Sequence, residues 1–310
     1  MNLPERPITV LVAALGGEGG GVLADWLIEA AAAHDFPVQS TSIPGVAQRT
    51  GATTYYIEIY PAKRALLGER QPVLALTPQP GNVDLMVASE LIEAGRAMQN
   101  GYVSPERTTL VASTHRIYAT IEKMHMGDGR FDSDRVVKAA QSLARRAILF
   151  DMERIARESG TVISAVLFGA MAGSDALPLA RSACEEAIRK GGKGVEPSLK
   201  GFALAFAHAS GEARESAAGE EKLWRGTRSE RVRSAFPPET HRILEEGVAR
   251  VADYQDAGYA ALYLDRLEPV AKLDSGAFRL TRETGRFLAL WMCYEDIIRV
   301  ADLKTRRSRF

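Results

Sequence analysis

The chain has 310 residues, of which 46% are hydrophobic and 25% are charged, a balance typical of a folded globular protein. Its 39 Lys and Arg residues equal its 39 Asp and Glu residues in number, which gives no electrostatic reason to expect binding of nucleic acid. No apolar run reaches the roughly 18–20 residues of a membrane span, and no signal segment opens the sequence. The two cysteines, Cys184 and Cys293, lie far apart and predict no metal site. We therefore expect a cytoplasmic protein with reduced thiols and no membrane span.

The first part of the chain has the pattern of an α/β protein. An apolar, β-branched run at residues 8–15 predicts a buried parallel strand, a glycine-rich loop follows it, and residues 22–33 predict a helix. This order opens a βαβ unit. Further strands are predicted at 37–40, 53–60, 84–88 and 108–113, a helix at 90–98, a long helix or helix pair over 132–159, and a buried segment at 162–171. The fold class is therefore a Rossmann-like open sheet flanked by helices.

The composition changes near residue 205. Residues 210–233 are small and charged, with few apolar anchors, which is typical of a linker or an exposed helical arm. Apolar spacing then predicts a helix from about residue 243 to 254 and a second helix over 283–303. We predict an α/β domain over residues 1–205 and a C-terminal helical extension over residues 206–310.

The glycine loop supports two interpretations. Glycines between a strand and a helix permit close approach of a ligand, and the helix that follows offers unpaired N–H groups to a phosphate. Alternatively, the glycines serve only a tight turn and close packing, and the local sequence does not decide between the two. A dinucleotide site lacks support, because the strand at 37–40 ends without a carboxylate, and no Gly-Lys-Ser/Thr triplet indicates a nucleoside-triphosphatase loop. The candidate ligand-binding residues in the loop are Gly16, Gly17, Gly19 and Gly20.

A second motif, residues 44–51, reads Pro-Gly-Val-Ala-Gln-Arg-Thr-Gly and precedes the strand at 53–60. Together with the glycine loop it resembles the gamma-type domain of 2-oxoacid:ferredoxin oxidoreductases, in particular the indolepyruvate (arylpyruvate) branch. The strand at 84–88 that leads into a Glu-bearing helix and the glycine-punctuated helix at 165–173 are similar to later parts of that domain. The resemblance covers roughly residues 7–205, and the remainder resembles the helical tail of longer beta subunits. Two positions depart from the family pattern: Ala14 replaces its first loop glycine, and Glu18 replaces a glutamine.

The resemblance implies a division of labour between subunits. Enzymes of this family decarboxylate a 2-oxoacid on thiamine diphosphate, pass electrons through iron–sulfur clusters to ferredoxin or another acceptor, and release an acyl-CoA. The alpha subunit carries the thiamine diphosphate, its magnesium and the [4Fe-4S] clusters. The gamma-type domain helps to cover the CoA and substrate region. We therefore expect a hetero-oligomer in which this chain binds no cofactor alone and contributes no catalytic residue or metal ligand.

The residues agree with this division. Two cysteines are too few to ligate a four-cysteine cluster. Thiamine enzymes bind magnesium with a Gly-Asp-Gly motif followed some 25 residues later by asparagine. Gly127-Asp128-Gly129 is present, but no asparagine follows Asn100. We interpret this tripeptide as a turn before a helix that starts near Asp132.

Three polar residues are candidates for contacts with a ligand. Arg49 lies in a glycine-flanked loop, where its guanidinium could bind a carboxylate or phosphate, or could form an interface ion pair. Gln48 could orient a substrate or cofactor amide, or only brace the loop. His115 follows a strand end, where ligands gather in open α/β sheets, so it is either a general acid or an ordinary exposed or capping histidine.

Two other functions remain open at this stage. The first is a self-contained nicotinamide- or flavin-binding oxidoreductase built on the same βαβ opening. The second is a non-catalytic scaffold subunit whose α/β domain has lost its ligand. A bound chromophore in the purified chain would favour the first, and a colourless chain without a partner would favour the second.

Overall fold

The computed structural model describes residues 3–43, 52–118, 122, 124, 129–212, 229–294 and 297–305. The chain divides into two compact units, Met1–Ser216 and Ala217–Phe310, which are described separately below. Helix α9, Val195–Ser210, continues across residue 205, the boundary predicted from composition.

The first unit contains a mixed six-stranded sheet in the order β2-β3-β1-β4-β5-β6. Strands β1, β4, β5 and β6 run parallel to one another, whereas β3 is antiparallel to both β1 and β2. The predicted βαβ unit is therefore split, because β3 lies between the parallel strands β1 and β2. The strands are β1 Ile8–Ala14, β2 Val38–Ile43, β3 Thr53–Ile59, β4 Leu85–Ala88, β5 Thr109–Ser113 and β6 Arg146–Phe150.

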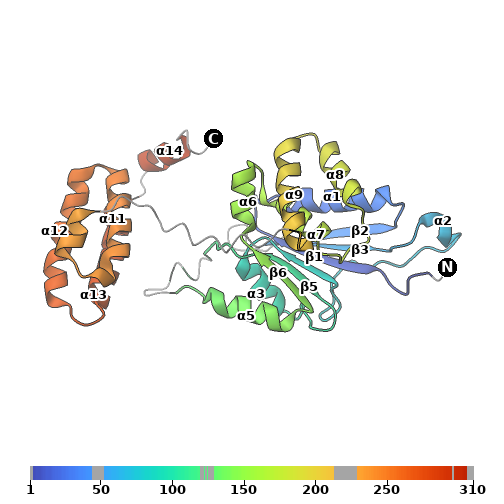
Figure 1. Cartoon of the computed structure of the whole chain (residues 1–310), viewed down its shortest axis with the longest axis horizontal. Coiled ribbons are helices and arrows are strands. Elements are labelled where there is room, and N and C mark those ends of the chain that lie inside the picture. The colour runs from blue at the N-terminus through green and yellow to red at the C-terminus, as the bar shows by residue number, and fades with distance from the viewer. Residues whose placement is uncertain are drawn as a thin grey trace. The chain divides into compact units, whose positions relative to one another are not determined.

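Helices cover both faces of this sheet (Figure 1). On one face the apolar sides of β1, β3 and β4 pack with α1, α6, α7, α8 and α9 into the larger core. On the other face, α3 and α5 cover a smaller core. Helix α7 is buried from Ile163 to Met171, and it approaches α9 so closely that a Cβ on Gly169 would lie 2.1 Å from the Phe202 carbonyl oxygen. The helices are α1 Gly20–Ala33, α2 Arg64–Leu67, α3 Leu91–Gln99, α5 Ser133–Leu143, α6 Met152–Ser159, α7 Ile163–Ala172 and α8 Arg181–Lys190.

The second unit is helical, as predicted for the C-terminal region. Helices α11, α12 and α13 enclose a core in which Tyr263 is fully buried. Its hydroxyl donates to the Gly285 carbonyl at 3.0 Å, and burial raises its pKa. A Cβ on Gly247 would lie 2.2 Å from that hydroxyl oxygen, so this ring requires a glycine on α11. The helices are α10 Glu230–Ala235, a 3-10 turn at Pro238–Thr240, α11 His241–Tyr254, α12 Ala257–Leu273, α13 Arg279–Met292 and α14 Ile297–Thr305.

Two predicted segments differ from the structure. The helical stretch predicted over 132–159 contains a strand, β6, between α5 and α6. This strand pairs with β5 at the sheet edge, and its apolar run at residues 147–150 is so short that it fits a buried helix segment as well as a strand. The helix predicted over 283–303 is two helices, because α13 ends at Met292 and α14 begins at Ile297.

Within the described ranges, no single helix is both long and apolar enough to cross a membrane. Taken together, helices α6 and α7 are long and apolar enough by length and composition, but the chain bends by 118° between them.

Candidate functional site

The glycine loop joins β1 to α1 at the carboxyl edge of the parallel strands. Gly17 and Gly19 have φ angles of +92° and +75°, in the left-handed region that side chains rarely adopt. A Cβ on Gly19 would lie 2.7 Å from Ser164 Oγ, and a Cβ on Gly20 would lie 2.6 Å from the Tyr55 ring. In contrast, no atom lies within 4 Å of the Cβ positions of Gly16 and Gly17. Gly19 and Gly20 are thus required by packing, whereas Gly16 and Gly17 border space that a ligand could enter.

Two uncapped helix N-termini meet at this loop. Helix α1 begins after Gly19 and α7 begins after Val162, and neither has a side-chain cap or an acidic residue in its first turn. Ser164 lies in the first turn of α7 against Gly19, and its buried hydroxyl has no hydrogen-bond partner among the described residues. Helices α3, α5 and α6 are instead capped by carboxylates. The loop therefore retains unpaired N–H donors and two partial positive charges, which favour an anion.

Glu18, the carboxylate that departs from the family pattern, is held within the loop. Its Oε2 accepts a hydrogen bond from the Leu15 N–H at 3.1 Å, and Ser89 Oγ accepts from the same N–H. Its Oε1 lies 3.8 Å from His115 Nε2. This carboxylate is therefore engaged at the end of β1, beside the His115 ring.

His115 links the glycine loop to β5. Its Nδ1 lies 2.8 Å from Ser113 Oγ, which accepts the Met152 N–H at 3.0 Å. The His115 side chain is mostly buried between Ser113 and Glu18, so it is not an exposed histidine. His115 therefore lies between the end of β5 and the carboxylate of Glu18, and a general-acid role for it stays a prediction.

Buried carboxylates and an arginine lie beside the loop. Glu90 caps α3 by accepting the Glu93 N–H at 3.0 Å, and Arg116 Nε lies 4.0 Å from its Oε2. Arg116 also donates to Glu122 at 2.5 Å. Burial raises the pKa of Glu90, although backbone N–H groups and the charge of Arg116 oppose this. Burial also raises the pKa of Glu93, with Arg96 opposing it. Carboxylates shifted upward in this way cluster at functional sites.

Sequence reasoning detected only part of this network. The Glu-bearing helix after the strand at 84–88 was predicted from the family resemblance, and it contains Glu93 three residues after the capping Glu90. Arg116 and Glu122 were missed, because only the loop between β5 and α5 brings them together. The described residues contain no group of three or more His, Cys, Asp or Glu side chains that could hold a metal ion.

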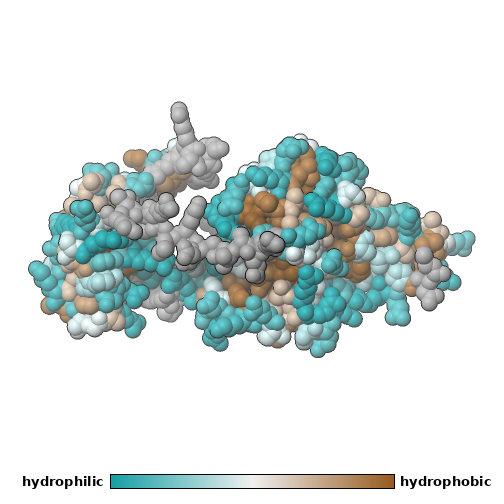
Figure 2. All heavy atoms as spheres, viewed as in Figure 1, coloured by the Kyte–Doolittle hydropathy of each residue, from teal (hydrophilic) through white to brown (hydrophobic). Residues whose placement is uncertain are grey.

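Exposed apolar side chains lie at the same edge of the sheet as the glycine loop. Val22 on α1, Ile43 at the end of β2, Ile117 and Tyr118 after β5, and Val162 before α7 are all exposed at this edge. Figure 2 shows apolar surface on this unit in the region of α6 and α9. Apolar groups collected around a candidate site are typical of a surface that another protein covers.

Gln48 and Arg49 lie outside the described residues. The strands on either side are described: β2 ends at Ile43, and β3 begins at Thr53, which pairs with Ala14 immediately before the glycine loop. Gly127 and Asp128 also lie outside the described residues, while α5 begins as predicted, at Ser133 with Asp132 as its cap.

Comparison with known families decides the classification of the first unit. A model described as pyruvate ferredoxin/flavodoxin oxidoreductase matches residues 9–208, more than half of the chain. The chain belongs to this oxidoreductase family. The family predicted from the two sequence motifs is thereby confirmed. A second model, a family of unknown function (DUF6537), matches residues 240–310, within the helical unit.

Individual relatives are distant. Indolepyruvate oxidoreductase subunit IorB of Archaeoglobus fulgidus is 22% identical over 204 residues, which cover 64% of this chain and 94% of that subunit. Among solved structures, a 2-oxoglutarate:ferredoxin oxidoreductase from Magnetococcus marinus is 16% identical with a TM-score of 0.47 over 67% of this chain. The match spans only 32% of that longer chain. The pyruvate oxidoreductase subunit PORC of Thermotoga maritima is 15% identical with a TM-score of 0.45, over 65% of this chain and 96% of that chain.

Proposed function

We propose that this chain is the beta (gamma-type) subunit of a thiamine-diphosphate-dependent 2-oxoacid oxidoreductase of the indolepyruvate (arylpyruvate) type. The proposal rests on the glycine loop, because two uncapped helix N-termini border open space there. The chain that contains this loop belongs to the oxidoreductase family named above. The distant similarity to an indolepyruvate oxidoreductase subunit supports the choice of an aromatic 2-oxoacid.

In this proposal the chain covers the CoA and substrate region. The backbone N–H groups near Gly16 and Gly17 hold a phosphate of CoA, because glycines at these positions leave the backbone accessible. Arg49 binds either a CoA phosphate or the carboxylate of the 2-oxoacid, and Gln48 orients a neighbouring amide. His115 and Glu18 keep the loop in its binding conformation.

The redox chemistry belongs to the partner. The alpha subunit supplies thiamine diphosphate, magnesium and [4Fe-4S] clusters, and the complex converts a 2-oxoacid and CoA into acyl-CoA, CO2 and two electrons for ferredoxin or another acceptor. The exposed apolar groups around the loop are the surface that we expect the alpha subunit to cover. A stable contact of this kind buries about 1,200–2,000 Å² in total.

The test is the steady-state kinetics of the assembled complex with Arg49→Ala, varying CoA and indolepyruvate separately. Losing a charge-assisted contact costs about 1.5–3 kcal/mol, which weakens the affected binding step roughly 10- to 150-fold. Arg49→Lys should recover only part of this loss, because a point charge cannot form two parallel hydrogen bonds. If the Arg49→Ala complex keeps the wild-type Michaelis constants and turnover, Arg49 contacts neither CoA nor the 2-oxoacid. A complex that fails to assemble would make Arg49 an interface residue instead.

A further inference from the structure

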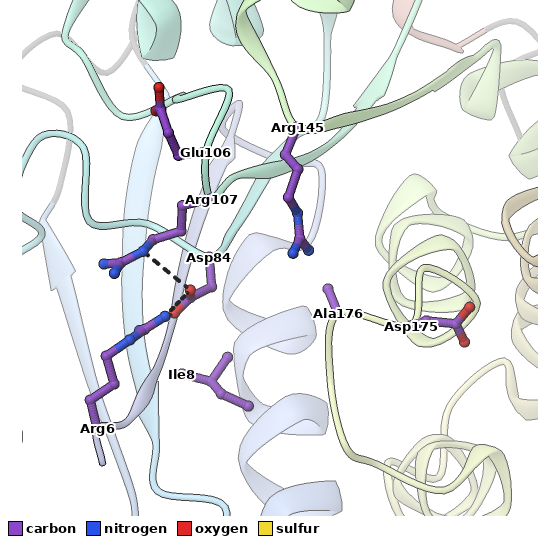
Figure 3. A pocket seen from close by; sticks show the side chains of 8 residues that line it. All are labelled: Arg6, Ile8, Asp84, Glu106, Arg107, Arg145, Asp175 and Ala176. Atoms are coloured by element: carbon purple, nitrogen blue, oxygen red, sulfur yellow. Dashed lines mark hydrogen bonds and ion pairs between the residues drawn. The ribbon is translucent and has the colours of Figure 1, made fainter. Parts of the chain in front are cut away.

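A small polar pocket lies at the amino edge of the sheet, at the opposite end of β1 from the glycine loop (Figure 3). Its volume is about 240 Å³. The residues around it stand where four parallel strands begin: Arg6 before β1, Asp84 before β4, Arg107 before β5 and Arg145 before β6. The complete lining is Arg6, Ile8, Asp84, Glu106, Arg107, Arg145, Asp175 and Ala176.

The charges that face this pocket are not balanced. Figure 3 shows Arg6 and Arg107 turned toward the carboxylate of Asp84, and Arg145 reaching into the pocket from the other side. The carboxylates of Glu106 and Asp175 point away from it. Three guanidinium groups therefore meet one inward-facing carboxylate, although the lining as a whole contains equal numbers of each sign.

Asp84 is already saturated by its neighbours. Arg6 donates to its two carboxylate oxygens at 2.7 and 2.6 Å, and the N–H and hydroxyl of Thr9 donate to Oδ2 at 2.9 and 3.0 Å. Burial would raise the pKa of Asp84, but the hydrogen bonds from Arg6 and Thr9 lower it overall. Arg107 Nε is 3.9 Å from Asp84 Oδ1, at the limit of an ion pair. Asp84 therefore neutralises Arg6 and leaves the other two cations largely uncompensated.

Arg145 uses few of its N–H donors within the described part of the chain. It donates to Thr109 Oγ1 at 3.3 Å, and no ion pair is found for it within the described part of the chain. A guanidinium carries five N–H donors in a planar fork that matches the oxygens of a phosphate. Arg145 therefore presents unused donors to a pocket with excess positive charge.

We propose that this pocket is a binding site for a phosphate-type dianion, with Arg145 and Arg107 as its ligands. The size of the pocket limits the ligand. Its volume of about 240 Å³ is that of about eight water molecules in the liquid, at roughly 30 Å³ each. It is smaller than most small-molecule sites, which measure roughly 300–1,000 Å³. The pocket fits free phosphate or a terminal phosphate monoester, whereas a whole nucleotide is too large. It is independent of the glycine loop and of the CoA site proposed there.

The experiment is isothermal titration of the full chain with inorganic phosphate, with chloride keeping the ionic strength constant. Arg145→Gln should weaken phosphate binding roughly fivefold to tenfold, since the lost contact is charge-assisted but partly exposed to solvent. Arg145→Lys should recover part of the affinity. The matched control is Arg154→Gln, which removes an exposed arginine from α6 and should leave binding unchanged. A parallel titration with glycerol 3-phosphate distinguishes free phosphate from a phosphate monoester as the preferred ligand.

Phosphate that binds at the glycine loop can be separated from phosphate that binds in this pocket. Arg145→Gln leaves the glycine loop intact, so it lowers only the binding at the amino edge. Equal phosphate affinity in wild type and Arg145→Gln would overturn the proposal, and so would the absence of saturable binding in the wild type. A loss of affinity in Arg154→Gln equal to that in Arg145→Gln would overturn it as well, because the effect would then be one of net charge.

Discussion

The two edges of the sheet hold their carboxylates in opposite ways. At the amino edge, Asp84 is paired with Arg6 and Thr9, and its pKa is lowered. At the carboxyl edge, Glu90 and Glu93 are buried beside the glycine loop, and burial raises their pKa values. Asp84 stabilises the fold as an anion, whereas a charge on Glu93 costs folding energy.

The difference indicates that Asp84 at the amino edge serves the stability of the fold, whereas the carboxyl edge serves a binding site. Asp84 ties the starts of β1 and β4 together through its hydrogen bonds with Thr9. The carboxyl edge combines uncapped helix N-termini with buried carboxylates whose pKa values are raised, and both features reduce stability. Features of this kind persist where a site needs them. Three substitutions test this contrast.

The largest effect is expected from Gly19→Ala, at the carboxyl edge. A left-handed φ costs about 1–2 kcal/mol for a non-glycine residue, and the new Cβ would lie 2.7 Å from Ser164 Oγ, so we expect a loss of about 2–4 kcal/mol. Gly160→Ala is the matched control, because Gly160 has φ +70° but open space around it, and should lose only the backbone part. Amide exchange of β1 reports on this unit alone. Equal losses at the two positions would remove the contact with Ser164 from the explanation.

A smaller loss is expected from Asp84→Asn, at the amino edge. Breaking a buried ion pair typically costs about 3–5 kcal/mol, and the exposure of Arg6 reduces this to about 1–3 kcal/mol. Because the folded pKa of Asp84 is lowered, its contribution is complete above the ordinary value of 3.8 and is lost as the pH falls through the folded value. The difference between wild type and variant should therefore shrink in acid. A difference that is the same at pH 7 and pH 3 would contradict the ion-pair account.

The smallest effect, with the opposite sign, is expected from Glu93→Gln. Burial raises the pKa of Glu93, so its charge costs folding energy at neutral pH, and the neutral variant should gain up to about 1 kcal/mol. The gain should decline as the pH falls through the raised folded value toward 4.5, where wild-type Glu93 becomes protonated. The ion pair that the variant loses subtracts little from this gain, because the Arg96 side chain is 40% exposed to solvent. A destabilised variant at neutral pH would show that Glu93 is needed as an anion.

Much of the fold was predictable, because its strongest local patterns agree with the tertiary structure. The run at 8–15, the loop and the helix behind it gave β1 and α1, and the alternating residues 53–60 gave β3. Strand β6 was not separated from the helices beside it, because its short apolar run at residues 147–150 fits a buried helix segment as well as a strand. The position of β3 between β1 and β2 was not predictable either, since it depends on pairing between distant segments.

The candidate site was predictable in position but not in detail. Local sequence could not separate the two interpretations of the loop, because the roles differ between glycines and depend on Ser164 and Tyr55, which are distant in sequence. The contact between Glu18 and His115 likewise joins residues on separate strand ends. Gln48 and Arg49 remain predictions from the sequence alone.

The central claim is that this chain completes a 2-oxoacid oxidoreductase whose redox groups lie on a partner. The most direct measurement is CoA-dependent reduction of a low-potential acceptor by indolepyruvate, with this chain alone, the thiamine-containing subunit alone, and the two co-expressed. The account predicts activity for the co-expressed pair and little or none for either subunit alone. Oxidation of the 2-oxoacid by this chain alone with a nicotinamide or flavin, or full activity of the thiamine-containing subunit without it, would contradict the account.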